Sequence, residues 1–262
     1  MSLSAHLLML PQWLAVLLLA AIAVSFSITG FLVVHRYIPV RIRQIHNDVA
    51  GFVFATLGTT YGVLLAFVVI VVWEQFNDTE IAVENESSTA LVLYHNILAY
   101  PNKSSSALLL QEFIDYARLS SINQTPLNAD KFTEDTALER LLTVCGSLVP
   151  VSQHEQILYS QILQNLNDLA KYRGLRLQAA IEELPGVVWV GLVMGGIITI
   201  GFTFLFGTEN LWAHVVMMSL LATMIAIVVY VVIELDHPTM GAVKAGLPEA
   251  YSKILKTAVI KP

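Results

Sequence analysis

The sequence predicts an all-α integral membrane protein with four transmembrane helices, arranged in two pairs around a helical soluble domain. Residues 49–73 contain no charged side chain, and apolar stretches of similar length recur at 13–34, 185–206 and 211–233. Each stretch can cross a hydrocarbon core of about 30 Å, which takes about 20 helical residues. A soluble core helix rarely has an apolar surface of that length on all sides. The stretches therefore predict four spans.

These spans divide the chain into four regions. A first helix pair occupies 1–73, with spans at about 13–34 and 50–73, and a second pair occupies 185–233, with spans at about 185–206 and 211–233. The soluble domain covers 74–184, and a tail covers 234–262. Of the 34 charged side chains, 22 lie between Glu74 and Glu183. This uneven distribution favours a polar domain between two membrane-embedded pairs.

The first apolar run is predicted to remain as a span and not to be cleaved as a signal peptide. His6 is the only titratable side chain before His35 and Arg36, so the run lacks a basic leader, and it is longer than a usual signal core.

The second span is predicted to continue into the soluble domain as one long helix. Apolar residues recur at helical spacing until Pro101, and further apolar stripes of the same period fill the domain. Breaks are expected at 101–106 and 122–130, which are rich in Pro, Asn and Ser.

The tail contains a short amphipathic segment. One face carries Leu247, Tyr251, Ile254, Leu255 and Ala258, with Lys253 and Lys256 beside it. Such a segment can lie along the membrane interface or dock on the soluble domain, and the sequence leaves both alternatives open.

The charges around the spans disagree about orientation. Arg36, Arg41 and Arg43 in the first connection favour a cytoplasmic loop and an external soluble domain. Basic residues before the third span and after the fourth favour the opposite arrangement. Because the first helices usually dominate, the rule leans towards an external domain.

Small residues mark candidate packing faces on two spans. Gly58 and Gly62 are four residues apart on the second span, as are Gly191 and Gly195 on the third. Such spacing lets helix backbones approach closely in lipid. The contacts are expected either within one subunit or, as we favour, between subunits of a homo-oligomer.

The second span is also the candidate pore helix. In a symmetric oligomer Glu74 would form a carboxylate ring at a pore mouth, and rings of this kind attract cations. The alternative is that Glu74 only begins a solvated acidic domain. The mid-span hydroxyls of Thr56, Thr59, Thr60 and Tyr61 can line a pore, or they can bond to each other or to backbone carbonyls, which is the commoner use. The candidate pore residues are Thr59, Val63, Phe67, Ile70 and Glu74.

Several classes of protein are disfavoured by what the sequence lacks. A net charge of −6 without a basic cluster argues against nucleic-acid binding. No HExxH, P-loop, GxSxG or paired-His motif is present, so we expect no enzyme activity, metal or cofactor. The single cysteine, Cys145, lies in an apolar helical pattern and is expected to be a packed thiol. The triplet from His46 to Asp48 suggests a helix N-cap.

Several segments resemble the bacterial bestrophin-like membrane proteins, also called the DUF4239 family. They are HNDVAGF at 46–52, YGVLLAFVV at 61–69, WEQ at 73–75, Leu93-Tyr94, Leu184-Pro185 with Trp189, Gly201-Phe202, and LDHP at 235–238 with Gly241. Thr239 and Met240 depart from the family pattern, which has an aromatic residue after the proline. The resemblance implies four spans in two pairs around a helical domain, but it implies no activity, because the family is defined by sequence.

The layout is also similar to that of true bestrophins, which are pentameric ion channels with a cytosolic soluble domain and a pore lined by the second span. Two functions are therefore expected as alternatives. One is a homo-oligomeric ion channel in the bacterial inner membrane, with inorganic ions as its substrates. The other is a non-conducting scaffold, or an assembly or stress factor, that binds a partner through its helical domain.

Overall fold

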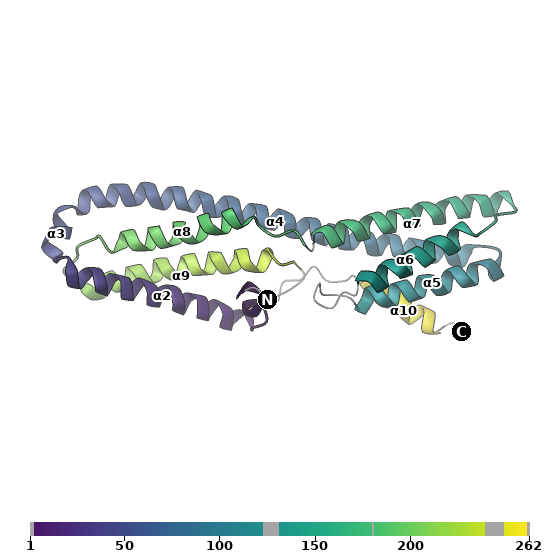
Figure 1. Ribbon diagram of the computed structural model, residues 1–262, viewed down its shortest axis with the longest axis horizontal. Helices are drawn as coiled ribbons and strands as arrows, with labels where there is room; N and C mark the ends of the chain where they lie inside the picture. The colour runs from purple at the N-terminus through teal and green to yellow at the C-terminus, as the bar shows by residue number, and fades with distance from the viewer. Residues whose placement is uncertain (1–2, 123–130, 180, 239–248, 261–262) are drawn as a thin grey trace. The chain divides into compact units, whose positions relative to one another are not determined.

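The computed structural model describes residues 3–122, 131–179, 181–238 and 249–260, and these residues form ten α-helices without a strand (Figure 1). The chain divides into two compact units. Unit 1 comprises Met1–Gln75 and Glu183–Val243, and unit 2 comprises Phe76–Glu182 and Lys244–Pro262. The predicted all-α class is confirmed. Thr239, Met240, Gly241, Leu247 and most of the expected break at 122–130 lie outside the described residues.

Unit 1 contains the membrane helices. Its elements are α1 (Leu3–Leu8), α2 (Gln12–Tyr37), α3 (Val40–Ile45), the first half of α4 (Asn47–Ala99), α8 (Gly186–Thr203) and α9 (Leu211–Leu235). Four of them, α2, α4, α8 and α9, are long and apolar enough to cross a membrane. Pro11, Pro39 and Pro185 each precede the first turn of a helix, where a fixed φ and a missing N–H cost nothing.

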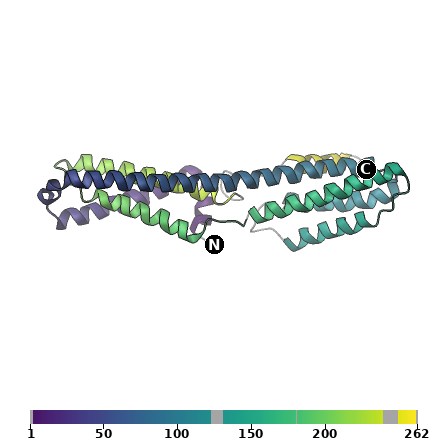
Figure 2. The same ribbon diagram turned by 90° about the horizontal axis from the view of Figure 1, so that it is seen from above.

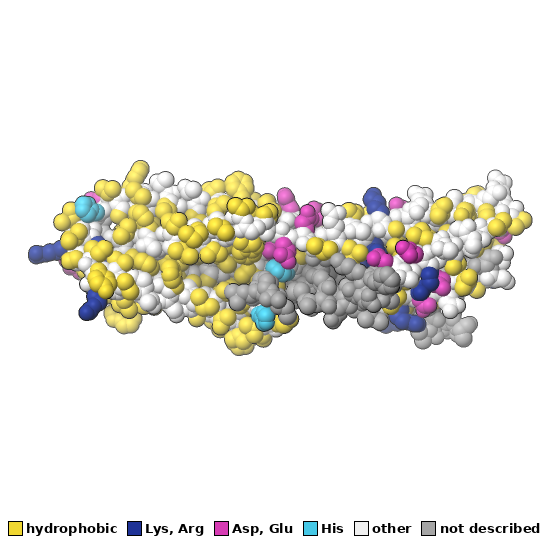
Figure 3. All heavy atoms as spheres, viewed as in Figure 1, with side chains coloured by type: hydrophobic (Ala, Val, Ile, Leu, Met, Phe, Trp, Pro, Cys, Tyr) yellow, Lys and Arg dark blue, Asp and Glu magenta, His cyan; other side chains and the backbone are white. Residues whose placement is uncertain are grey.

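The spans of unit 1 pack loosely and leave most of their surface exposed. Helix α2 packs mainly on α9, and α8 lies against both, with a small core between them. The buried members of this core are Phe31, Tyr61, Ile200, Phe204, Met218, Ala222 and Ile225. Only 11–33% of each span is buried inside the chain. Hydrophobic side chains accordingly make up much of the visible surface of unit 1 (Figure 3), and this apolar surface needs lipid or another subunit to cover it.

Helix α4 is one continuous helix of 53 residues that belongs to both units. It ends at Ala99, two residues before Pro101, because the residue before a proline disfavours the α conformation. The single long helix predicted from the apolar spacing is thus confirmed.

Unit 2 is a helical bundle. In two views, α5 (Lys103–Ile122), α6 (Lys131–Gly146) and α7 (Gln153–Ala179) lie side by side with the second half of α4 (Figures 1 and 2). Tyr251 and Ile254 of α10 (Glu249–Ile260) are each 1% exposed in the core of this bundle. Of the two alternatives for the amphipathic tail, the structure shows the docked one. Cys145 is buried in the same core, as predicted, and desolvation raises the pKa of its thiol.

Candidate functional site

The five candidate pore residues share one exposed face of α4. Their spacings of four, four, three and four residues confine them to a sector of about 80° at 100° per residue. Val63, Phe67 and Ile70 are 50%, 64% and 52% exposed, and Thr59 and Glu74 are exposed as well. Nothing within the described part of the chain covers this face. It is therefore available to a pore, to lipid or to a neighbouring subunit.

The mid-span threonines bond to their own helix. Thr56, Thr59 and Thr60 each donate to the carbonyl four residues earlier, at 3.2, 2.8 and 2.9 Å. This confirms the alternative in which these hydroxyls satisfy backbone acceptors. Each oxygen still carries a free lone pair, so the donor is occupied while acceptor capacity remains.

Tyr61 points away from the threonines and meets α8. Its hydroxyl donates to the Leu192 carbonyl at 2.9 Å, and its ring covers two glycines of α8. A Cβ added at Gly195 would lie 2.5 Å from the Tyr61 ring, and one at Gly196 would lie 3.0 Å from the Tyr61 hydroxyl. The two glycines therefore form a socket for Tyr61, in which a Cβ at residue 195 would require the ring to shift and a Cβ at residue 196 would be tightly packed.

The other predicted packing glycines have open space beside them. A Cβ at Gly58, Gly62 or Gly191 would meet no atom within 4 Å. Of the four glycines, only Gly195 makes its close contact inside the chain. The faces at Gly58, Gly62 and Gly191 remain candidates for contacts with a second copy.

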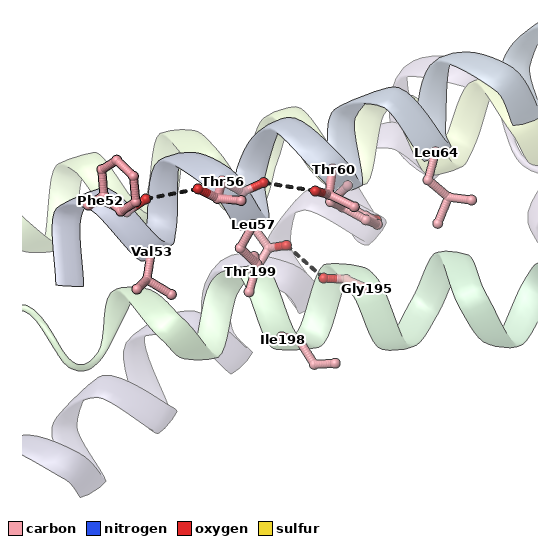
Figure 4. Close-up of a pocket in the computed structure, with 10 residues that line it drawn as sticks. Phe52, Val53, Thr56, Leu57, Thr60, Leu64, Gly195, Ile198 and Thr199 are labelled. Carbon is pink, nitrogen blue, oxygen red and sulfur yellow. Dashed lines mark hydrogen bonds between the residues drawn. The ribbon is translucent and has the colours of Figure 1, made fainter. Parts of the chain in front are cut away.

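A groove lies between α4 and α8 beside Tyr61 (Figure 4). It has a volume of about 620 Å³ and is lined almost wholly by apolar atoms. The Thr199 hydroxyl donates to the Gly195 carbonyl at 2.7 Å, so its hydrogen is used in a bond within its own helix. The lining residues are Phe52, Val53, Thr56, Leu57, Thr60, Tyr61, Leu64, Gly195, Ile198 and Thr199.

The start of α4 is fixed to the turn between α8 and α9 by a pair of hydrogen bonds. The Asn47 amide donates to the Gly207 carbonyl at 2.7 Å and accepts from the Gly207 N–H at 2.9 Å. A Cβ at Gly207 would lie 2.5 Å from the Gln44 nitrogen, so the backbones touch here. Asp48 lies in the first turn of the helix, as predicted. Asn47, however, bridges two segments, a role that the N-cap interpretation missed.

Arg43 holds the same turn from α3. The side chain is only 5% exposed, and its guanidinium donates to the carbonyls of Phe204 and Phe206 at 3.0 and 3.2 Å. A third bond joins its Nη2 to Nδ1 of His35 at 2.9 Å. Because arginine can only donate, this ring nitrogen accepts and carries no proton. Burial lowers the pKa of Arg43. From the sequence alone, Arg43 indicated only the orientation of the first connection relative to the membrane.

The start of α8 is tied to the end of α9 through Asp236. Its carboxylate accepts from the Leu184 N–H at 2.8 Å and from the Trp189 side chain. Asp236 is 3% exposed, and burial raises the pKa of its carboxyl although both hydrogen bonds oppose that shift. One turn earlier, the Tyr230 hydroxyl donates to Glu234 at 2.8 Å. Two of the segments that carried the family resemblance, Leu184-Pro185 and LDHP, thus meet in space.

Unit 2 contains a buried ion cluster that sequence reasoning missed. Arg176 donates to Glu86 at 2.6 Å and to Glu134 at 2.9 Å, and both carboxylates are 1% exposed. The Tyr116 and Tyr251 hydroxyls also donate to Glu86, at 3.3 and 3.0 Å. The partners lie 30 to 165 residues from Glu86 along the chain, so no local residue spacing predicts the cluster. Its members link α4, α5, α6, α7 and α10.

The described residues hold no group of three or more His, Cys, Asp or Glu side chains placed to bind a metal ion.

The fold is that of an all-helical membrane protein with four candidate spans. A bestrophin-like domain model matches residues 21–246, and the chain belongs to the bestrophin-like family. A crystal structure of a Klebsiella pneumoniae bestrophin homologue with an isoleucine-to-threonine mutation is similar at a TM-score of 0.70. The two chains are 12% identical, and the match covers 93% of this chain and 99% of that one. A leucine-to-threonine variant matches at 0.70 and 11% identity, over 94% of this chain and 98% of that one. A comparison with curated proteins gave no match.

Proposed function

We propose that the protein is a homo-oligomeric ion channel of the bacterial inner membrane in which α4 lines the pore. The observation that carries the proposal is the uncovered face of α4, which presents Thr59 at one end, Glu74 at the other and apolar side chains between them. A ring of copies places both polar groups at the ends of a narrow apolar passage.

Two physical effects follow from this arrangement. Val63, Phe67 and Ile70 form an apolar constriction, which can close a pore to ions by dewetting. A ring of Glu74 carboxylates raises the local concentration of cations beside a low-dielectric wall. We therefore expect monovalent cations to pass in preference to chloride. No catalytic step is involved.

The test is conduction by the purified protein in planar bilayers. The unaltered channel should pass Na⁺ or K⁺ better than chloride, and Glu74→Lys should reduce or invert that preference. The effect should shrink as salt rises, because the Debye length falls from about 10 Å at 0.1 M to about 3 Å at 1 M.

Glu80→Lys is the matched control for this experiment. Glu80 is exposed on the same helix, six residues beyond Glu74, and therefore about 120° away from it around the helix axis and outside the sector of the candidate pore residues. The control should leave selectivity largely unchanged. A stable, assembled oligomer that passes no current at any voltage or pH would contradict the channel proposal and favour the scaffold.

A further inference from the structure

Tyr61 is the one polar anchor in the buried surface of the pore helix. Within 50–73, all of which the structure describes, only Tyr61, Val68 and Val72 are buried. Of these three, only tyrosine can form a directional bond, and it bonds to Leu192 of α8. The residues on either side of it, Thr60 and Gly62, are exposed.

The direction of this contact matters. Tyr61 is two residues after Thr59 and two before Val63, so it lies about 200° around the helix from each of them. The contact with α8 is therefore directly behind the candidate pore face. A change in the distance between α4 and α8 at this level moves the pore face along the pore radius.

The Tyr61 side chain limits this distance in both directions. Its ring rests on the socket of Gly195 and Gly196 and prevents closer approach, because a single added Cβ would already overlap the ring at 2.5 Å. Its hydroxyl bonds to the Leu192 carbonyl at 2.9 Å and opposes separation. The groove of about 620 Å³ beside it shows that α4 and α8 are not otherwise close-packed here (Figure 4). Without the ring, the helices have room to close.

We propose that Tyr61 is the positioning residue that sets the pore radius, with its ring as a spacer and its hydroxyl as a tether between α4 and α8. This inference rests on the proposed channel function. Shortening the spacer lets α4 move towards α8 and widens the pore. A larger distance between α4 and α8 pushes α4 towards the pore axis and narrows the pore.

The experiment compares single-channel conductance among four variants in planar bilayers. Gly195→Ala forces the ring from 2.5 Å to an ordinary contact of 3.4–4 Å, a shift of about 1 Å, and conductance should fall roughly twofold as the apolar passage narrows. Tyr61→Leu should raise conductance. In the double variant, Gly195→Ala should add little to the effect of Tyr61→Leu, so conductance should stay raised, because the ring that the added methyl group would displace is absent. Tyr61→Phe keeps the spacer and loses the tether, so conductance should persist while open times change.

Gly201→Ala is the matched control, since it adds the same methyl group to the same helix at a site with no atom within 4 Å. It should leave conductance unaltered. Equal conductance in all four variants, or additive effects in the double variant, would overturn the proposal.

A second readout separates this inference from the channel proposal. Electron cryomicroscopy of the same variants in nanodiscs gives the Cα–Cα distance between residues 61 and 195 without any current. A shortened distance in Tyr61→Leu with no current in any variant would support the spacer and refute the channel. An unchanged distance in both Tyr61→Leu and Gly195→Ala would refute the spacer.

Discussion

Arg176 donates through Nε to Oε2 of Glu86 at 2.6 Å, although 90 residues separate them and the carboxylate is 1% exposed. Burial by itself would lower the pKa of Arg176, but the charge and hydrogen bond of Glu86 raise it well above its ordinary value. The guanidinium also reaches Glu134, which pairs with the buried Arg173 as well, at 3.3 Å, so Glu86 depends on Arg176 while Glu134 has two cations. The ion pair between Arg176 and Glu86 joins α7 to the second half of α4.

Removing that cation should strongly destabilise unit 2. Arg176→Met leaves Glu86 and Glu134 buried with less compensation, and breaking such a pair costs about 3–5 kcal/mol. The free energy of unfolding from chemical denaturation measures the loss. The control is Arg140→Met, because its pair with Glu112 at 3.1 Å is half exposed and contributes about 0–1 kcal/mol. Similar losses in the two variants would contradict the assigned importance of the cluster.

The tail helix is held by the same cluster. Tyr251→Phe removes the hydroxyl that donates to Glu86 at 3.0 Å while keeping the ring in the core. We expect a loss of about 1.5–3 kcal/mol, typical of a hydrogen bond to a charged group, and faster amide exchange in α10. Thr257→Val on the exposed face of α10 is the control, since its hydroxyl donates only to the Lys253 carbonyl. Equal exchange in the two variants would contradict the anchoring role.

The sequence was sufficient for the spans and insufficient for the contacts that fix them. The spans follow from composition and length, which are local properties, and so does the continuity of α4 up to Pro101. The pairs Asn47–Gly207 and Arg176–Glu86 join positions 160 and 90 residues apart, and no local sequence pattern predicts either pairing. Tyr61 stood out only as one polar group in an apolar span. Its socket became visible once the structure placed Gly195 opposite it.

The corner between α3 and α4 offers a test of such a remote contact. Asn47→Ala removes both hydrogen bonds to Gly207 and leaves buried backbone groups unsatisfied, which costs about 1–3 kcal/mol. Asn47→Asp retains an acceptor for the Gly207 N–H and loses the donor, so its loss should be smaller. The melting temperature of each variant in nanodiscs measures its loss of stability. Equal losses would show that the bond from the Gly207 N–H to the retained acceptor contributes nothing.

The open glycines on α4 predict how the oligomer assembles. Gly62→Leu should abolish the native assembly while membrane insertion persists, because leucine suits lipid but prevents close helix approach. Size-exclusion chromatography in mild detergent measures the assembly. Val71→Leu, at an exposed position of the same helix, is the control for added bulk. An unchanged elution profile and melting temperature for Gly62→Leu would remove this face from the interface.

The last prediction concerns the sidedness of unit 2. Asn47 bonds to Gly207, so the first connection and the turn between α8 and α9 lie on one side of the membrane. Ser104 precedes α8 and Glu209 follows it, and one span therefore separates these two exposed positions. A membrane-impermeant maleimide on intact cells should label only one of Ser104→Cys and Glu209→Cys.

Both substitutions are made in a Cys145→Ser background. In the unaltered protein, Cys145 should react with the maleimide only after unfolding, because it is buried and its thiol pKa is raised. The arginines of the first connection predict that Glu209→Cys is cytoplasmic and that Ser104→Cys is labelled. Labelling of Glu209→Cys alone would reverse this orientation and place unit 2 in the cytoplasm, as the resemblance to true bestrophins implies. Labelling of both positions would contradict the four-span arrangement itself.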